Sequence, residues 1–245
     1  MNIAKQMAGK GDRFAHWSEC LNHFQYAIWH PETLSEESYK KANINFLGVL
    51  DEVFRFFRDN AGVRDEWESP ARVHVYPLGQ QIWCQSRKQS EDYRFGIHGD
   101  TFRLEVGVSN AWNIKHMPNE FWALLTETYE YGALSFTENA VLRSSQECPI
   151  KPELLRAARS DIYKMIRNYI LFEQAAQGPV YDLGFLEIAW PCSISWSNLL
   201  EKGTQAFRCL HQLNYRLWRC EYQREQAVSK RLRKAYEQEG TQAYR

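Results

Sequence analysis

The chain has 245 residues, of which 44% are apolar and 24% are charged, a composition typical of a folded globular protein rather than a disordered one. Thirty Lys and Arg residues balance thirty Asp and Glu residues, so the molecule as a whole has no charge that attracts nucleic acid or a membrane. The first residues lack the apolar stretch of a signal peptide, and the longest apolar run, Phe121–Leu125, is too short to cross a bilayer. Six scattered cysteines without a CxxC pair favour reduced thiols. We therefore expect a soluble, cytoplasmic protein without membrane contacts.

The first sixty residues predict two amphipathic helices. Apolar residues at three- and four-residue steps between Arg13 and Trp29 form one stripe, and the proline that follows ends it. A second helix begins near Thr33 or Ser35, where Thr33 and Glu36 could form a capping box, and it ends at Asn60-Ala61-Gly62. The short connection between them predicts an antiparallel pair.

The segment Tyr93–Val108 predicts a β-hairpin, because apolar residues alternate on both sides of Gly99-Asp100. A two-residue loop of the primed type fixes the register of such a hairpin. Three apolar pairs then share one face, and one charged pair lies on the other: Ile97 with Phe102, Phe95 with Leu104, Tyr93 with Val106, and Arg94 with Glu105.

An earlier hairpin joins Val73–Tyr76 to Ile82–Cys84 through Pro77-Leu78-Gly79, so four consecutive strands form an antiparallel meander. Helical patterns follow at 118–131 and 152–177, with a mixed segment at 132–147 between them. A fifth strand is predicted at 184–190, and a long helical segment begins near Trp196, where Gly203 is expected to kink or split it.

Together these elements define an α+β fold. A central antiparallel β-meander of four to five strands is flanked by N-terminal and C-terminal helices, and the last helix is long. We expect residues 1–245 to form one domain, with a weak subdivision near 148–152 as the alternative. Nine Trp, thirteen Tyr and thirteen Phe indicate a core of large side chains, the alternative being an aromatic binding surface.

A metal site has weak candidates in His16, Cys20 and His23. With His30 they lie within about 80° of one another on a helix, so neighbours three or four residues apart could share a metal ion. All four cannot, because fourteen residues of helix span about 21 Å. No second cluster in the sequence supplies further ligands, and we expect neither a metal nor another cofactor.

Catalytic signals are similarly weak. Asp100, Glu105 and Gly107 resemble the D…ExK pattern of metal-dependent nucleases, but glycine occupies the lysine position and both acids belong to one hairpin. Glu105 is explained as the partner of Arg94 and Asp100 as a turn residue, while His98 beside the turn is a candidate general base. Cys148 and Cys192 lack the neighbourhood of a known nucleophile, and nucleophile-elbow, dinucleotide and kinase motifs are absent from the sequence.

Charge is unevenly distributed along the chain. Residues 204–245 contain nine basic and four acidic residues, a net charge of +5, whereas residues 32–68 contain nine acidic and five basic residues, a net charge of −4. The two segments could pack together, within one molecule or between two copies, or the cations could contact phosphates or simply remain solvated. Beyond Arg219 the apolar stripe becomes sparse, as is typical of a projecting arm.

The sequence therefore favours a non-catalytic binding protein, that is, a regulator, an inhibitor or an assembly subunit. Its expected partner is another protein, in a hetero- or homo-oligomer. The alternatives are a metal-dependent hydrolase or nuclease that uses the central hairpin, and a nucleic-acid-binding protein that uses the C-terminal helix. The predicted binding residues are the cations of that helix: Arg216, Arg224, Lys230, Arg231, Arg233 and Lys234.

Overall fold

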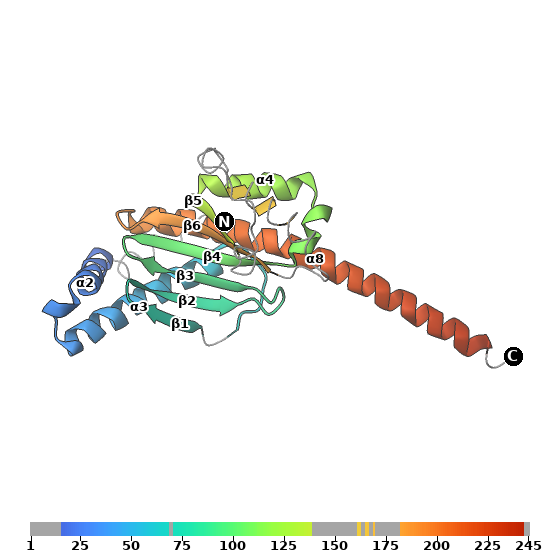
Figure 1. The fold of residues 1–245 in the computed structure, drawn as a ribbon, viewed down its shortest axis with the longest axis horizontal. Helices are drawn as coiled ribbons and strands as arrows, with labels where there is room; N and C mark the ends of the chain where they lie inside the picture. Colours follow the sequence, from blue (N-terminus) through green and yellow to red (C-terminus); the bar gives the residue numbers. More distant parts are fainter. Residues whose placement is uncertain are drawn as a thin grey trace, which may run out of the picture.

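The fold combines a six-stranded sheet with helices (Figure 1). The computed structural model describes residues 16–68, 71–138, 161–162, 165–166, 169 and 182–242. Its helices are α2 (Trp17–Trp29), α3 (Glu36–Asn60), α4 (Asn119–Glu127) and α8 (Trp196–Gln242), with short 3-10 turns at Pro31–Thr33, Ala111–His116 and Thr128–Glu130. Its strands are β1 (Arg72–Tyr76), β2 (Gly79–Gln85), β3 (Asp92–His98), β4 (Thr101–Ser109), β5 (Ala133–Glu138) and β6 (Asp182–Pro191). The predicted α+β class is confirmed.

The sheet has the order β1-β2-β3-β4-β6-β5, and every neighbouring pair is antiparallel. The predicted four-strand meander corresponds to β1–β4. The predicted fifth strand is β6, which lies between β4 and β5. The mixed segment supplies β5, so the sheet has six strands rather than four or five.

The register of the central hairpin is confirmed at each predicted pair: Tyr93 with Val106, Arg94 with Glu105, Phe95 with Leu104, and Ile97 with Phe102. Gly99 adopts a φ of 61°, the left-handed conformation that a two-residue primed turn requires.

Helices α3 and α8 cover the apolar face of the sheet and lie behind it in Figure 1. Phe57 of α3 meets Phe95 of β3 edge to face, with ring centroids 5.0 Å apart. Phe54 contacts Phe207 of α8 in the same manner at 6.0 Å. Burial of each such ring contributes about 1.5–3 kcal/mol, so this aromatic layer holds both helices on the sheet.

Two local predictions are wrong. Ser35, not Thr33, caps α3: its Oγ accepts a hydrogen bond of 3.2 Å from the backbone N–H of Ser38. Thr33 lies in a 3-10 turn that begins at Pro31, and its hydroxyl donates to the His30 carbonyl instead. Gly203 does not split α8, which runs unbroken; it lies inside the helix where the Phe57 ring approaches the backbone. Most of the helix predicted at 152–177 lies outside the described residues.

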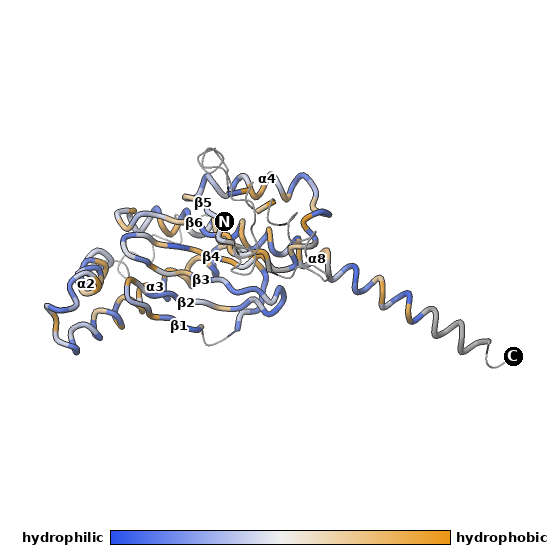
Figure 2. Tube along the Cα trace, in the orientation of Figure 1, coloured by the Kyte–Doolittle hydropathy of each residue, from blue (hydrophilic) through white to orange (hydrophobic). Residues whose placement is uncertain are grey.

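Helix α8 has a packed half and a projecting half. Phe207, Leu210, Leu213 and Leu217 are buried, whereas every residue from Tyr222 to Arg233 is exposed. We call Tyr222–Arg233 the arm; Figure 1 shows this part of α8 extending away from the sheet, and Figure 2 shows that hydrophilic residues dominate it. Across the described residues, none of the helices combines the length and the hydropathy that a membrane span requires.

Candidate functional site

The predicted binding residues do not form one cluster. Lys230, Arg231 and Arg233 are exposed in the arm. Arg216 is half-buried, and Nη1 of Arg224 lies 3.4 Å from Oδ1 of Asn113. The side chain of Lys234 lies outside the described residues. Four of the six predicted cations, Arg224 among them, are therefore exposed residues of the arm.

Four of the nine acids in the acidic segment at 32–68 pair with a Lys or Arg close to them in the chain. Glu36 pairs with Lys40, Asp51 with Arg55, Asp59 with Arg58, and Glu68 with Arg72. Among the side chains that the structure describes, none of these acids pairs with a cation of α8. Segment 32–68 and α8 meet elsewhere: Asp65 accepts a hydrogen bond of 2.8 Å from His211, and the Ala61 carbonyl accepts one of 2.7 Å from Arg208.

Four rings form an aromatic row on α8: His211, Tyr215, Trp218 and Tyr222. Consecutive centroids lie 6.5, 5.5 and 5.3 Å apart, and the Trp218 and Tyr222 rings are stacked with an interplanar angle of 23°. Steps of four, three and four residues place the rings on one side of the helix. Exposure increases toward the arm, from buried His211 to Tyr222, which is 46% exposed.

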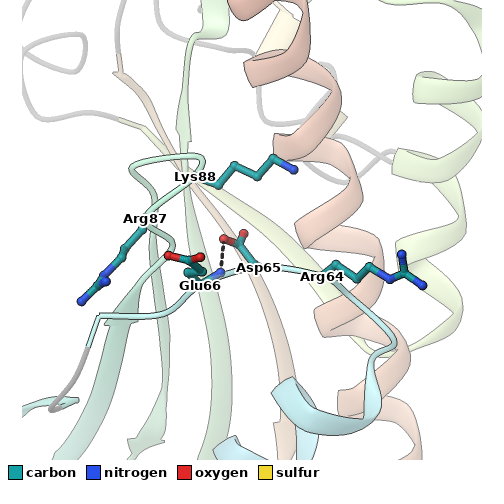
Figure 3. Close-up of a pocket in the computed structure, with 5 residues that line it drawn as sticks. All are labelled: Arg64, Asp65, Glu66, Arg87 and Lys88. Carbon is teal, nitrogen blue, oxygen red and sulfur yellow. Dashed lines mark hydrogen bonds between the residues drawn. The ribbon is translucent and has the colours of Figure 1, made fainter.

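The loop between β2 and β3 adds a cation to this row. Lys88 Nζ lies 4.9 Å from the centroid of Tyr215 and 5.2 Å from that of Trp218, within the range of cation–π attraction. Lys88 also lines a hollow of about 550 Å³ with Arg64, Asp65, Glu66 and Arg87. Figure 3 shows that the long cationic side chains diverge from the hollow and that Arg87 and Lys88 point in different directions. The hollow and the aromatic row therefore form one continuous surface through Lys88.

A buried hydrogen-bond network centred on Asp65 lies under the hollow that this residue lines. Asp65 Oδ2 accepts from His211 Nε2 at 2.8 Å and from Ser86 Oγ at 2.7 Å, and its side chain is 0% exposed. Burial raises the pKa of Asp65, but the hydrogen bonds from His211 and Ser86 outweigh it and the pKa is lowered. Gln89 continues the network by donating to the His211 carbonyl and accepting from the Tyr93 hydroxyl.

This Ser86–Asp65–His211 set is not arranged for nucleophilic catalysis. In a catalytic triad the serine hydroxyl donates to the imidazole, which acts as the base. Here the Asp65 carboxylate lies between the two residues, and Ser86 donates to it instead of to His211. Ser86 is also fully buried. The network instead fixes the 63–68 segment and the β2–β3 loop against α8.

The weak catalytic candidates are spread along the central hairpin. Asp100 is exposed in the turn, and His98 is half-buried opposite Thr101. Glu105 lies five strand positions beyond Asp100, or about 17 Å. The structure therefore does not bring Glu105 together with the two residues at the turn.

Glu105 occupies a charged row on the face of the sheet opposite the aromatic core. Its cross-strand neighbours are Arg94 on β3 and Glu187 on β6. Arg94 forms an ion pair of 3.6 Å with Asp92, and Arg103 forms one of 3.3 Å with Glu187. Burial, and then the charge of Glu187, raise the pKa of Glu105. Two adjacent carboxyl groups are a feature that local sequence pattern could not reveal, because β4 and β6 are far apart in the chain.

The metal candidates lie along a groove between α2 and α3. His16, Cys20 and His23 line this groove, whose volume is about 680 Å³, and His16 Nδ1 lies 3.4 Å from Glu19. Within the described ranges, no three His, Cys, Asp or Glu side chains are grouped closely enough to hold a metal ion. Burial raises the pKa of Cys192 to about 12, so this thiol is protonated at neutral pH. Cys148 lies outside the described residues.

The chain matches no protein-family model and no curated protein.

Proposed function

We propose that this is a non-catalytic cytoplasmic binding protein that engages its partner through α8. The observation that carries the proposal is the arm, in which twelve consecutive residues are exposed. It contains four basic residues and one acidic residue, a net charge of +3. A surface of this charge attracts an anionic partner and increases its rate of association.

The energetics of the arm support this role. A helix gains most of its stability in a protein from packing, and a segment of twelve residues alone is marginal in water. Val228 and Leu232 are 53% and 54% exposed on this unpacked segment, so they add apolar area that a partner can bury. A regulator or an assembly subunit that presents its binding helix in this way requires no catalytic set.

The arrangement of the polar groups gives less support to a hydrolase or nuclease. Asp65 is held by His211 and Ser86, and Glu105 is separated by about 17 Å of strand from Asp100. Glu105 and Glu187 are adjacent, and Arg103 pairs with Glu187. We interpret both sets as structural.

The test compares association of the full-length protein with that of an arm variant, Lys230→Gln/Arg231→Gln/Arg233→Gln. Sedimentation measures self-association, and fluorescence anisotropy measures binding of labelled single-stranded DNA, single-stranded RNA and duplex DNA. A control, Lys40→Gln/Lys41→Gln/Arg55→Gln, removes the same charge from α3.

We expect at least one association to weaken in the arm variant and to persist in the control. Equal association in all three proteins would contradict the proposal. Turnover of an oligonucleotide that is lost in Glu105→Gln, with the fold intact, would contradict its non-catalytic part and support the nuclease alternative.

A further inference from the structure

We infer that the aromatic row, the Lys88 loop and one side of the arm form a track for single-stranded nucleic acid. This inference rests on the proposed function, because it assigns a ligand class to the same helix. Proteins that bind single strands without sequence preference combine cations that follow the backbone with aromatic rings on which bases stack. The two features occur together on α8.

The rings are positioned for stacking before a ligand arrives. Trp218 and Tyr222 already stack on each other at 5.3 Å, and Tyr215 continues the series at 5.5 Å. Tyr222 ends the row with 46% of its surface exposed, so it offers a ring to a base. At its other end the row is anchored, because buried His211 is held by Asp65.

The cations lie where the phosphates of a stacked strand would pass. Lys88 is held over Tyr215 and Trp218, and Arg64 is exposed on the rim of the adjoining hollow, whereas Arg87 points away from Lys88 (Figure 3). Because the Asp65 side chain is 0% exposed and bonded to His211, Glu66 is the one exposed acid among the five residues that line this hollow. The rim therefore has a positive charge beside the rings.

Arg219 and two residues of the arm extend the track with cations on the same side of the helix. At 100° per residue, Arg219, Lys230 and Arg233 lie within about 80° of Tyr222. Arg224 and Arg231 lie about 160–180° away, on the opposite side. From His211 to Arg233 the track spans about 33 Å.

A single strand fits this surface better than a duplex or an acidic protein does. In a duplex the bases are already stacked on one another, so Tyr222 would have no free base face to contact. A duplex would then contact only the cations, through its phosphates, and not the aromatic row. An acidic protein would use the cations without requiring flat rings at stacking distance. The rings and the cations together therefore select an anionic ligand with accessible aromatic faces.

The experiment measures anisotropy of labelled 20-nucleotide single-stranded RNA and DNA, and of a 20-base-pair duplex, over a series of salt concentrations with the full chain. Tyr222→Ala should weaken single-strand binding by roughly 5- to 100-fold, whereas Tyr222→Phe, which keeps the ring, should retain it. Arg219→Gln/Arg233→Gln should lower the slope of log K against log salt by about 1.4, since each phosphate contact contributes about 0.7.

The matched control is Lys40→Gln/Lys41→Gln, which removes the same charge from the exposed side of α3, away from α8. It should leave single-strand binding within about twofold of wild type, by the same counterion argument. Circular dichroism establishes that each variant keeps its helix.

The outcomes separate this inference from the proposed function. Equal losses in Arg219→Gln/Arg233→Gln and in the Lys40→Gln/Lys41→Gln control, or no loss in Tyr222→Ala, would overturn the track. Duplex binding or self-association that depends on the arm, without single-strand binding, would overturn the track but retain a binding role for α8. If no association depends on the arm, both fail.

Discussion

Gly203 tests the packing of α8 on α3, on which the position of the whole binding surface depends. Alanine in an exposed helix interior is about 1 kcal/mol more favourable than glycine. At Gly203, however, an added Cβ would lie 2.8 Å from Cε2 of Phe57 and closer still to Cζ and Cε1 of the same ring. Phe57 is 0% exposed and packs edge to face on Phe95, so the ring has little room to move.

The two effects can be compared in magnitude. Overpacking of a core costs about 1–3 kcal/mol, which exceeds the gain in helix propensity. Gly203→Ala should therefore destabilise the protein by about 1–2 kcal/mol and lower Tm by about 2–8 °C. Gly48→Ala provides the control, because nothing lies within 4 Å of its added Cβ and Gly48 is exposed on α3.

Urea denaturation followed by circular dichroism measures both variants. Gly48→Ala should gain about 0.5–1 kcal/mol while Gly203→Ala loses about 1–2 kcal/mol, so the variants should differ by about 1.5–3 kcal/mol. Equal gains in the two variants would show that α8 does not approach Phe57 in the way described here. The placement of the aromatic row beside the β2–β3 loop would then be refuted as well.

Three further predictions concern single side chains, with stability measured by urea denaturation. Asp65→Asn should lower the free energy of unfolding by about 1.5–3 kcal/mol at pH 7, because it replaces the charged carboxylate that accepts from His211 and Ser86 by a neutral amide with one acceptor oxygen and a donor NH2. This loss should shrink as pH falls below 3.8, since the folded-state pKa of Asp65 is lowered and its stabilising charge is lost in that range. Glu105→Gln should raise the free energy of unfolding by about 0.2–1 kcal/mol at pH 7, and by less near pH 4.5. The folded-state pKa of Glu105 is raised, so the wild-type protein loses stability as pH rises above 4.5, whereas the glutamine variant does not. Ser35→Ala should lower the free energy of unfolding by about 1 kcal/mol, because it removes the N-cap of α3. For each of the three variants, an unchanged free energy of unfolding would refute the role given to that side chain.

Local signals were sufficient to predict the central hairpin. Gly99-Asp100 and the alternation around it specify both the turn and the register, and these involve residues close in sequence. The position of β6 between β4 and β5 could not be predicted, because pairing of segments about 80 residues apart leaves no mark in the local pattern of either strand. The break predicted at Gly203 is absent for a related reason: a glycine within a helical pattern indicates a break, but here it makes room for the Phe57 ring, which belongs to a distant part of the chain.

The candidate site was partly accessible from sequence. The excess of cations after residue 204 and the sparse apolar stripe beyond Arg219 predicted an exposed basic helix. The aromatic row could also have been found, since Tyr215, Trp218 and Tyr222 follow steps of three and four residues. Lys88 could not, because its place over the rings depends on how the β2–β3 loop packs against α8.

The most direct test of the central claim is hydrogen exchange with mass spectrometry on the full-length protein, with and without a 20-nucleotide single-stranded RNA. Binding through α8 predicts slower exchange in peptides that cover residues 211–235 and in the β2–β3 loop, with strands β3 and β4 unchanged. Protection concentrated around Glu105 and the Gly99-Asp100 turn, with residues 222–233 exchanging as in the free protein, would contradict it. Such a pattern would place the function on the central hairpin instead.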